Sequence, residues 1–342
     1  MRIKLPSSEQ LLYAANALFN RLFFKQGYAP KIQSVLVVKW DEIGDMATAT
    51  HVFKALRSSY PNVHLTVLCK PFVKNLIQYD PNIDEIITEI RDFNKKFDAV
   101  IELRGTFETL KKAIRYGVKY RCGRAEVRLK NKGKQLHELQ TNFQSVLPLL
   151  KPEIIEERPV LYFSENDSRI VEQFIHQRNI KKFAIIHAGA RRKLRQWEPL
   201  KFRKIVEYLH AKYNLDIVFA GANEDLATIQ TIAEGLEFAT YDFIGDYTLS
   251  QFSCLCSKAQ FYVGNESGPL HIASAFNVPL VALYGPGVPD VFYPSSDKRA
   301  VLHHVLECNP CDQIHCVHPD NPCISRIQVH DVICKIDEIL IF

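Results

Sequence analysis

Asp45 is the residue whose type and position best suit proton transfer. It follows a strongly apolar run, 34–40, and stands at the start of a helical pattern that predicts one continuous helix over 46–60. The positive end of a helix favours an ionised carboxylate, and such a carboxylate in a cleft can accept a proton from an alcohol as a general base. An Asp that only caps the helix is the alternative, and Asp41 and Glu42 are close enough in sequence to share the role.

A loop after the apolar run 183–187 has the residues of a diphosphate clamp. Four cations lie within five positions, at the end of an expected strand. Arginine binds phosphate through paired hydrogen bonds, and lysine acts as a point charge. A solvated basic loop is the alternative, but the place at a strand end favours binding. The residues of interest are His187, Gly189, Arg191, Arg192, Lys193 and Arg195.

A second anion-binding candidate lies where an expected strand gives way to a helix near Pro269, since proline is favoured at the first helical position. Free N–H groups and the helix dipole attract anions at such a start, and Gly268 lets a phosphate approach the backbone closely. Ser267 and His271 belong to the same turn, and Glu266 precedes it. An ordinary capped helix is the alternative.

A further acidic site follows the apolar run 215–221. Glu224 could accept hydrogen bonds from the hydroxyls of a ribose, as acidic residues do in nucleotide-binding folds. The alternative is a helix that Asn223 caps, with Glu224 and Asp225 as ordinary first-turn acids.

All these candidates lie at the ends of expected strands. Near-continuous apolar runs alternate with helical patterns, which predicts parallel sheets covered by helices on both faces. A proline-rich, charged segment, 148–168, divides the pattern into two doubly wound α/β units. Ligands of such sheets bind at the carboxyl ends of the strands, so the cleft between the units is the expected site. The expected strands are 34–40, 62–69, 83–89, 97–103, 183–187, 215–221, 261–265 and 278–285.

The composition excludes several other classes of protein. Of the 342 residues, 47% are hydrophobic and 24% are charged, with a net charge of +5, which is the balance of an ordinary globular protein. No apolar run is long enough to span a membrane. The glycine-rich dinucleotide and P-loop patterns are absent after the expected strands, so hydride transfer and P-loop phosphoryl transfer lose their main support.

Two segments are candidates for contact with a membrane. Residues 9–24 predict an amphipathic helix that either packs on its domain or lies on a membrane surface. Residues 111–134 carry ten cations against the single acid Glu126, which would attract an anionic acceptor or anionic lipid head groups. A solvated surface is the alternative, and aromatic residues are too sparse there to favour nucleic acid. The predicted patch comprises Lys111, Lys112, Arg115, Lys119, Arg121 and Arg124.

Four of the nine cysteines crowd into residues 308–323. Together with His315 and His318 they are ligand types for zinc or an iron–sulfur cluster, although their spacing is not one of the standard zinc patterns. Packing or a small loop staple is the alternative. No convincing signal-peptide pattern is present, so we expect reduced thiols in a cytosolic protein. The candidate ligands are Cys308, Cys311, Cys316 and Cys323.

Taken together, these segments resemble glycosyltransferase family 9, the bacterial heptosyltransferase family of lipopolysaccharide core synthesis. The resemblance extends from Ser34 to Asp337, and the order and spacing of the segments are more specific than any one of them. The matching segments are V-L-V-V-K-W-D-E-I-G-D-M, H-A-G-A followed by R-x-W-E-P, G-N-E-S-G-P-L-H-I-A-S-A, and V-P-L-V-A-L-Y-G-P.

The resemblance implies a GT-B fold, in which two Rossmann-like doubly wound domains with parallel sheets face each other across a cleft. We expect an acceptor-binding domain at 1–165 and a nucleotide-sugar-binding domain at 166–325. A C-terminal helix at 326–342 would pack back on the first domain.

The implied activity is inverting transfer of a sugar, heptose from ADP-heptose, to a lipopolysaccharide-core-type or other lipid-linked anionic glycan. No cofactor and no metal would be required for transfer, although the cysteine cluster could hold a structural metal. The enzyme would be cytoplasmic and peripheral to the inner face of the cytoplasmic membrane, with no nucleic-acid partner.

Positions that match the family's motifs imply individual roles. Asp45 would be the general base, and Arg195 would contact the donor phosphates in a place where some members have Lys. Glu266 stands where the family usually has Asp, so its carboxylate reaches one methylene further toward the donor sugar. The remaining donor-site residues would be His187, Gly189, Lys193, Glu224 or Asn223, Ser267, Gly268 and His271.

Other activities stay open. A relative could use a different nucleotide sugar, or a catalytically degenerate member could bind a glycan or a lipid. A metal-dependent redox or regulatory protein built around the cysteine cluster is a further alternative. Transfer assays with ADP-heptose against UDP- and GDP-sugars, before and after chelation, would separate them.

Overall fold

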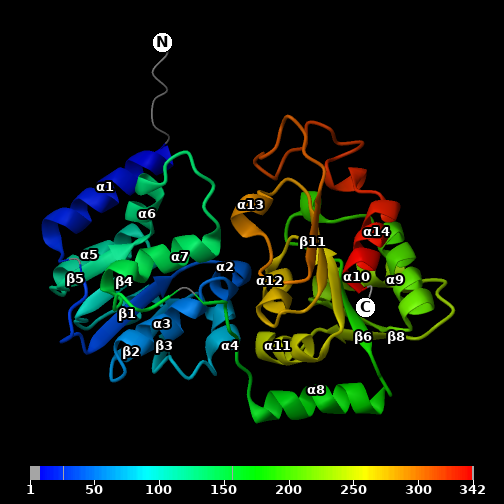
Figure 1. The fold of residues 1–342 in the computed structure, drawn as a ribbon, viewed down its shortest axis with the longest axis horizontal. Coiled ribbons are helices and arrows are strands. Elements are labelled where there is room, and N and C mark those ends of the chain that lie inside the picture. Colours follow the sequence, from blue (N-terminus) through cyan, green and yellow to red (C-terminus); the bar gives the residue numbers. More distant parts are fainter. Residues whose placement is uncertain (1–7, 26, 156, 341–342) are drawn as a thin grey trace. The chain divides into compact units, whose positions relative to one another are not determined.

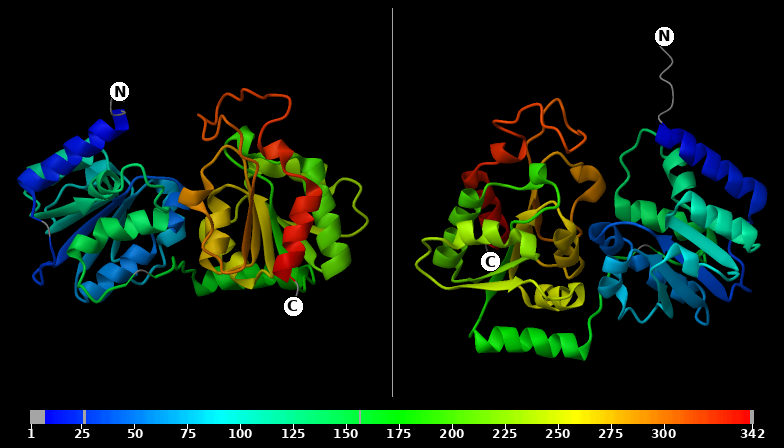
Figure 2. Two further views of the ribbon diagram at one scale, coloured as in Figure 1. Left: turned by 45° about the horizontal axis from the view of Figure 1, so that its top comes forward. Right: turned by 180° about the vertical axis from the view of Figure 1, so that it is seen from behind.

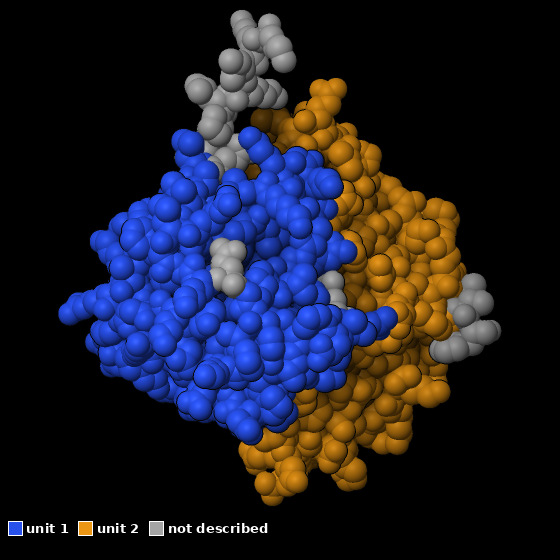
Figure 3. Space-filling view, turned by 60° about the vertical axis from the view of Figure 1, so that its left-hand side comes forward, with its two compact units in different colours: residues 1–160 blue, residues 161–342 orange. Residues whose placement is uncertain are grey.

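A computed structural model of the chain describes residues 8–25, 27–155 and 157–340. The chain divides into two compact units, Met1–Val160 (unit 1) and Leu161–Phe342 (unit 2), which Figure 3 shows in different colours. The division falls inside the proline-rich segment 148–168.

Unit 1 is built on a parallel sheet with strand order β3-β2-β1-β4-β5. The central strand β1 pairs with β2 and β4, so that Val37 lies opposite both Val67 and Ile101. These residues are fully buried, because helices cover both faces of the sheet (Figures 1 and 2). The strand order reverses between β1 and β4, which makes this the topological switch point. The strands are β1 (Ser34–Lys39), β2 (His64–Cys69), β3 (Glu85–Ile87), β4 (Ala99–Arg104) and β5 (Tyr120–Gly123).

The helices of unit 1 differ from expectation after the first strand, where one continuous helix over 46–60 was predicted. The structure has two helices there, and Asp45 lies inside the first of them. The Thr48 and Thr50 hydroxyls donate hydrogen bonds to the carbonyl oxygens of Asp45 (3.0 Å) and Ala47 (3.3 Å). Such side-chain bonds compete with a regular helix. The helices are α1 (Ser8–Phe23), α2 (Ile43–Ala47), α3 (His51–Ser59), α4 (Lys74–Ile77), α5 (Phe107–Arg115), α6 (Arg124–Lys130) and α7 (Glu138–Val146), with short 3₁₀ turns at Pro71–Val73, Ile90–Asp92 and Leu147–Leu149.

Helix α1 packs on α6 (Figure 1), and its polar side faces inward. Asn20 is buried, and the Oδ1 atoms of Asn16 and Asn20 both accept hydrogen bonds from Arg121. The Asn20 amide also donates to Glu126 of α6. The expected amphipathic helix is therefore present, but its apolar side points away from the unit. Among the described helices, none combines the length and apolar character that a membrane crossing requires.

Unit 2 is built on a parallel sheet with strand order β11-β10-β9-β6-β7-β8. Numbered from β6, this is the order 3-2-1-4-5-6 of a Rossmann fold, with its switch point between β6 and β9. Strands β8 and β11 were not predicted, because their side chains are only partly buried. The strands are β6 (Phe183–His187), β7 (Asp216–Gly221), β8 (Thr240–Ile244), β9 (Phe261–Asn265), β10 (Leu280–Tyr284) and β11 (Arg299–His303).

The last helix of unit 2, α14 (Val329–Leu340), contributes to the core of its own unit, where Val332 and Ile336 lie with Val281 of β10. The expected packing of a C-terminal helix at 326–342 on the first domain stays a prediction. Figures 1 and 2 show α14 beside α9. The other helices are α8 (Glu165–Gln177), α9 (Pro199–Tyr213), α10 (Leu226–Ala233), α11 (Leu249–Lys258), α12 (Gly268–Ala275) and α13 (Pro289–Phe292), with 3₁₀ turns at Lys193–Arg195, Asn223–Asp225 and Ile324–Arg326.

Candidate active site

The carboxyl ends of β1 and β4 carry a group of charged side chains. Lys39, the last residue of β1, is fully buried. Its Nζ atom lies 3.3 Å from Oε1 of Glu138 and 3.6 Å from Oδ2 of Asp41. Arg104, the last residue of β4, lies 4.0 Å from the same Asp41 oxygen. At the switch point of unit 1, each of these cations therefore lies close to an acidic side chain.

Glu138 is the acid on which these charges converge. It is fully buried, and both Arg124 and Arg128 pair with its carboxylate, Arg128 at 3.1 Å. Burial alone would raise the pKa of Glu138, but Lys39, Arg124 and Arg128 hold it at about 2. Glu138 therefore stays ionised and keeps the buried Lys39 compensated.

Asp45 lies in the first turn of α2, next to this charged group. Burial raises the pKa of Asp45 to about 6, with Lys39 opposing the rise and Asp41 adding to it. A carboxylate with a pKa just below neutrality is mostly ionised at pH 7, yet basic enough to take a proton from a hydroxyl. This pKa is compatible with a general base, and that role of Asp45 stays a prediction.

In unit 2, the loop after β6 and the end of β9 are joined by an ion pair. The Nη1 atom of Arg195 lies 3.3 Å from Oε1 of Glu266. The Nε atom of Arg195 donates to Oε1 of Gln313 at 2.8 Å. Glu266 is 4% exposed, and burial raises its pKa to about 7, while Arg195 lowers it. Near neutral pH this carboxyl group can gain or lose a proton.

Glycine at position 287 makes room for the Glu266 carboxylate. A Cβ atom on Gly287 would overlap both carboxylate oxygens of Glu266. A Cβ on Gly285 would meet the Leu194 carbonyl oxygen at 2.6 Å, in the turn that carries Arg195. The loop after β10 thus packs closely against both members of the ion pair. Sequence reasoning included Gly285 only as part of a matching segment, and Gly287 lay just outside that segment.

Asn265, the last residue of β9, positions the loop after β6. Its Nδ2 atom donates to the Ala188 carbonyl oxygen at 2.7 Å, and its Oδ1 accepts from the Trp197 backbone N–H at 3.1 Å. Trp197 is itself buried, and its indole N–H donates to the Ile327 carbonyl oxygen at 3.0 Å. Sequence reasoning missed this role of Asn265. The sequence signal that could have indicated this role is an amide side chain at the end of an apolar strand.

His187 and Ser267 come together at the ends of β6 and β9. The Ser267 hydroxyl oxygen lies 3.4 Å from Nδ1 of His187. Burial lowers the pKa of His187, against the opposite effect of Asp225. Helix α12 begins at Gly268, and within the described structure the Ser267 side chain makes no hydrogen bond that caps it. His271, in the first turn, is buried with its ring 6.3 Å from that of Phe292.

The acidic residue that reaches this loop is Asp225, one position from the predicted Glu224. A Cβ atom on Gly189 would overlap the Asp225 carboxylate. The same carboxylate accepts the Ala222 backbone N–H at 2.9 Å. Glu224 and Lys193 are instead exposed to solvent. The local pattern of acids predicted the turn, but it did not distinguish which acid points toward Gly189.

The predicted basic patch is divided between surface and interior. Lys111, Arg115 and Lys119 are exposed, and Lys112 is half-buried with its Nζ donating to the Phe93 carbonyl oxygen at 3.1 Å. Two of the predicted members are withdrawn from the surface to different degrees. Arg121 is fully buried against Glu102, and Arg124 is partly buried and paired with Glu138. In each case a buried acid compensates the charge of the arginine.

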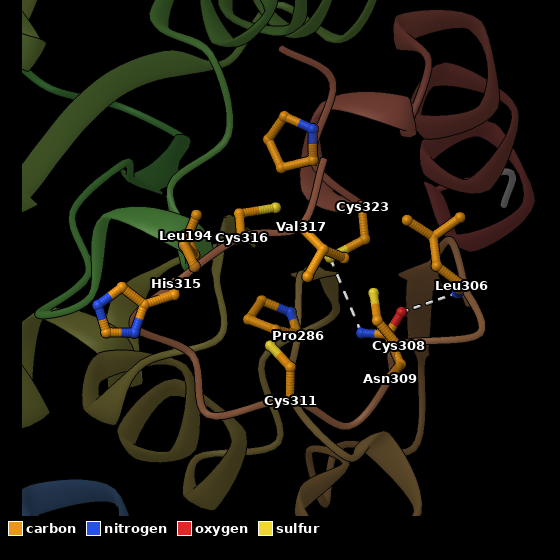
Figure 4. Close-up of a pocket in the computed structure, with 11 residues that line it drawn as sticks. Leu194, Pro286, Leu306, Cys308, Asn309, Cys311, His315, Cys316, Val317 and Cys323 are labelled. Atoms are coloured by element: carbon orange, nitrogen blue, oxygen red, sulfur yellow. Dashed lines mark hydrogen bonds between the residues drawn. The ribbon is translucent and has the colours of Figure 1, made fainter. Parts of the chain in front are cut away.

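The four cysteines of the C-terminal cluster line one pocket of unit 2, together with Leu194 and Pro286 (Figure 4). Asn309 lies 3.9 Å from the Cys323 sulfur through its Nδ2 atom. In the part of the chain that the structure describes, no three His, Cys, Asp or Glu groups are arranged to hold a metal ion. The pocket adjoins the turn 193–195, so the cluster borders the Arg195 loop.

The switch point of unit 2 thus combines a cationic loop, the start of helix α12 and a buried carboxylate. Two parallel-sheet α/β units of this kind form the GT-B fold, which solved family 9 glycosyltransferases share. The sequence model of glycosyltransferase family 9 (heptosyltransferase) matches residues 90–320. The chain belongs to this family.

Three similar proteins come from two bacteria. Lipopolysaccharide heptosyltransferase 3 of Escherichia coli is 24% identical over 279 residues, which cover 71% of this chain and 80% of that protein. The solved family 9 glycosyltransferase of Veillonella parvula DSM 2008 has 20% identity and a TM-score of 0.76, over 90% of this chain and 97% of that one. The ADP-heptose lipopolysaccharide heptosyltransferase II of Escherichia coli has 20% identity and a TM-score of 0.70, over 90% and 99%. These structural likenesses confirm the predicted GT-B fold.

Proposed function

We propose that this glycosyltransferase takes heptose from ADP-heptose and transfers it, with inversion, to a hydroxyl of a lipopolysaccharide-core-type or other lipid-linked anionic glycan. Family membership and the names of the Escherichia coli relatives support the donor and the acceptor class. The observation that carries the proposal is the meeting of Arg195, Glu266 and the start of α12 at the switch point of unit 2.

Unit 2 would hold the donor through its diphosphate. The guanidinium of Arg195 and the N–H groups at the start of α12 are suited to the phosphate oxygens, with Lys193 as an additional cation and Ser267 and His271 in the same turn. His187, Gly189 and the acids of the 223–225 turn would then lie toward the nucleoside. Negative charge develops on departing ADP as its bond to the anomeric carbon breaks, so each such hydrogen-bond donor stabilises the transition state more than the ground state, by roughly 3–4 kcal/mol.

Binding of a diphosphate would also act on Glu266. A phosphate that draws Arg195 away removes the cation that lowers the pKa of this buried carboxyl group. Glu266 would then take up a proton and could donate a hydrogen bond to a sugar hydroxyl. This change links donor binding to recognition of the sugar.

Asp45 of unit 1 would activate the acceptor. Its carboxylate accepts the hydroxyl proton while the acceptor oxygen bonds to the anomeric carbon and the bond from that carbon to the diphosphate oxygen breaks. Attack from the face opposite the leaving ADP inverts the configuration. Arg195, Lys193 and the start of α12 neutralise the leaving group in this scheme, so the proposal requires no divalent metal.

A lipid-linked acceptor places the enzyme at the inner face of the cytoplasmic membrane. Exposed Lys111, Arg115 and Lys119 in unit 1 supply positive charge that an anionic acceptor or head group would attract. This peripheral location follows from the proposed acceptor.

A panel of nucleotide sugars tests the proposal. Because a ligand that binds only the folded state raises the melting temperature, ADP-heptose should produce a larger shift than UDP- and GDP-sugars at equal concentration. Transfer from ADP-heptose to a deacylated core oligosaccharide should then be detectable by mass spectrometry. A shift and transfer with another sugar nucleotide alone would replace heptose as the donor. Such an outcome would fit the longer side chain of Glu266 at a position where the family usually has Asp.

A further inference from the structure

The outward face of α1 is apolar, whereas its inward face is polar. Residues at helical spacing on the outward side are between 37% and 69% exposed, and a helix places residues three and four positions apart on one face. This reverses the usual arrangement, in which the apolar stripe of a helix faces the core. The exposed apolar residues are Leu11, Leu12, Leu18, Phe19, Leu22 and Phe23.

The inward face is held by polar bonds that leave no freedom to turn the helix over. Arg121 of β5 is fully buried and donates to the Oδ1 atoms of both Asn16 and Asn20. It also pairs with Glu102 of β4, while Asn20 donates to Glu126 of α6. Rotating α1 to bury its leucines would strip partners from this buried arginine, which is unfavourable.

The residues that follow α1 fix the C-terminal end of the helix on unit 1. The Lys25 backbone N–H donates to the Lys119 carbonyl oxygen at 2.8 Å, which adds a short parallel bridge to the edge strand β5. Phe24 is buried in a cluster with Leu110 and Ala113 of α5. The outward apolar face of α1 is therefore a fixed feature of unit 1.

Positive charge borders this apolar face. Arg21 lies on α1, Lys25 follows it, and Lys119 is bonded to Lys25 through the backbone. All three side chains are exposed. An apolar helical face flanked by cations is suited to the interface of an anionic bilayer, because the leucines enter the acyl boundary while the cations stay among the head groups.

We propose that α1 is an in-plane membrane anchor that binds an anionic phospholipid bilayer through Leu11, Leu18 and Leu22 and their neighbours. The inference deepens the proposed function, in that a lipid-linked acceptor would lie in the same membrane. It does not depend on which sugar is transferred.

Vesicle co-sedimentation of the full chain tests the anchor. The wild type should bind vesicles of phosphatidylethanolamine and phosphatidylglycerol, and it should bind phosphatidylcholine vesicles more weakly. The variant Leu11→Gln/Leu18→Gln/Leu22→Gln should lose at least about tenfold in vesicle affinity. A matched control, Ile155→Gln/Leu200→Gln/Val305→Gln, removes three equally exposed apolar residues elsewhere and should bind like wild type.

The cations should act separately from the leucines. Arg21→Gln/Lys25→Gln/Lys119→Gln should weaken binding to the anionic vesicles by about fivefold per cation at low salt, with little effect on binding to phosphatidylcholine. In the variant Phe19→Trp, the indole emission should shift to shorter wavelength on vesicle addition and be quenched by brominated lipid. This readout requires no loss of function, so it holds even if a triple variant misfolds.

Several results would overturn the anchor. Wild type that ignores anionic vesicles, or a triple Gln variant that binds as well as wild type, contradicts it. A concentration-dependent dimer that the Gln substitutions abolish, without vesicle binding, would instead assign the face to a second copy of the chain.

Transfer to a soluble, deacylated acceptor separates this inference from the proposed function. The triple Gln variant should retain wild-type transfer to that acceptor, since α1 carries none of the proposed catalytic groups. A wild type that binds vesicles through α1 but transfers no sugar would refute the proposed function alone. A wild type that transfers sugar but never binds vesicles would refute the anchor alone.

Discussion

Arg195 and Glu266 form an ion pair across the switch point of unit 2, with Nη1 of the arginine 3.3 Å from Oε1 of the glutamate. Arg195 follows β6 and Glu266 follows β9, which are neighbours in the sheet. Because the carboxylate is buried and Gly287 packs directly against it, its protonation depends strongly on where the guanidinium lies.

Replacing Glu266 with Gln should change how stability depends on pH. Burial raises the pKa of Glu266 from an ordinary 4.5 to about 7, while Arg195 opposes the rise. The folded state therefore binds this proton more tightly than the unfolded state, and stability falls as the pH rises through this window. The loss from this group is on the order of 3 kcal/mol. When the free energy of unfolding is measured by chemical unfolding from about pH 5 to about pH 8, the Gln variant should gain stability relative to wild type. If the two free energies depend on pH in the same way, Glu266 is not a buried acid with a raised pKa.

Replacing Arg195 with Gln should weaken ADP binding. Loss of a charge-assisted hydrogen bond to phosphate predicts about a tenfold to hundredfold higher dissociation constant by calorimetry. Lys181→Gln is the matched control, since this exposed cation lies before β6, at the opposite end of the strand, and should leave ADP binding unchanged. Equal affinity of the Arg195 variant and wild type would remove Arg195 from the donor site.

Asp45→Asn should abolish the proton transfer and leave donor binding intact. We expect transfer to slow by about 10²- to 10⁴-fold, with ADP affinity within error of wild type. Because burial raises the pKa of Asp45 to about 6, the wild-type rate should rise as the pH increases through that value. An Asn variant that loses ADP affinity in proportion to its rate would argue against the base role.

Gly189→Ala should destabilise unit 2, because the added methyl group overlaps the Asp225 carboxylate. We expect a loss of about 1–3 kcal/mol in the free energy of unfolding, typical of overpacking. Asp225→Ala removes the carboxylate that the added methyl group would overlap. The double variant should therefore lose less free energy of unfolding than the two single variants lose together. Strict additivity in this double-mutant cycle would show that the two residues do not interact.

Exhaustive chelation should leave sugar transfer unchanged, since the proposed mechanism neutralises ADP with cations and a helix start. Elemental analysis of the purified protein, and of Cys308→Ser/Cys311→Ser, tests the cysteine pocket separately. An activity that falls on chelation and returns with one metal ion would contradict the metal-independent scheme.

The strands with both faces buried were predictable from sequence. The bounds of β6 and β9 agree with expectation, because an uninterrupted apolar run reports burial on both faces. Strands β8 and β11 were not predicted, since edge strands expose part of their side chains. The four-residue strand β5 was not predicted either, although three of its residues are buried. The break between α2 and α3 was not predicted either. It depends on threonine hydroxyls that donate hydrogen bonds to backbone carbonyl oxygens of the preceding turn.

The positions of the site residues were more predictable than their partners. Local patterns alone placed His187 at the end of β6, Glu266 directly after β9, and Asp45 in the segment that follows β1. The partners of the site residues are distant in sequence. Lys39 and Glu138 are 99 residues apart, and Arg195 and Gln313 are 118 residues apart. Such pairs depend on strand order and on how loops pack, which no local pattern specifies. The basic patch shows the same limit, because a run of cations does not reveal that buried acids compensate Arg121 and Arg124.

The position of α14 has a consequence for how the chain folds during translation. Its apolar residues complete the core of unit 2 beside β10 and β11, yet they follow every strand of that sheet in the sequence. The first unit is formed from a continuous stretch that emerges early, and domains fold as units in that order. Unit 2 cannot close its core until α14 has been translated, so nascent chains stalled between β11 and α14 would carry a folded unit 1 and an incomplete unit 2.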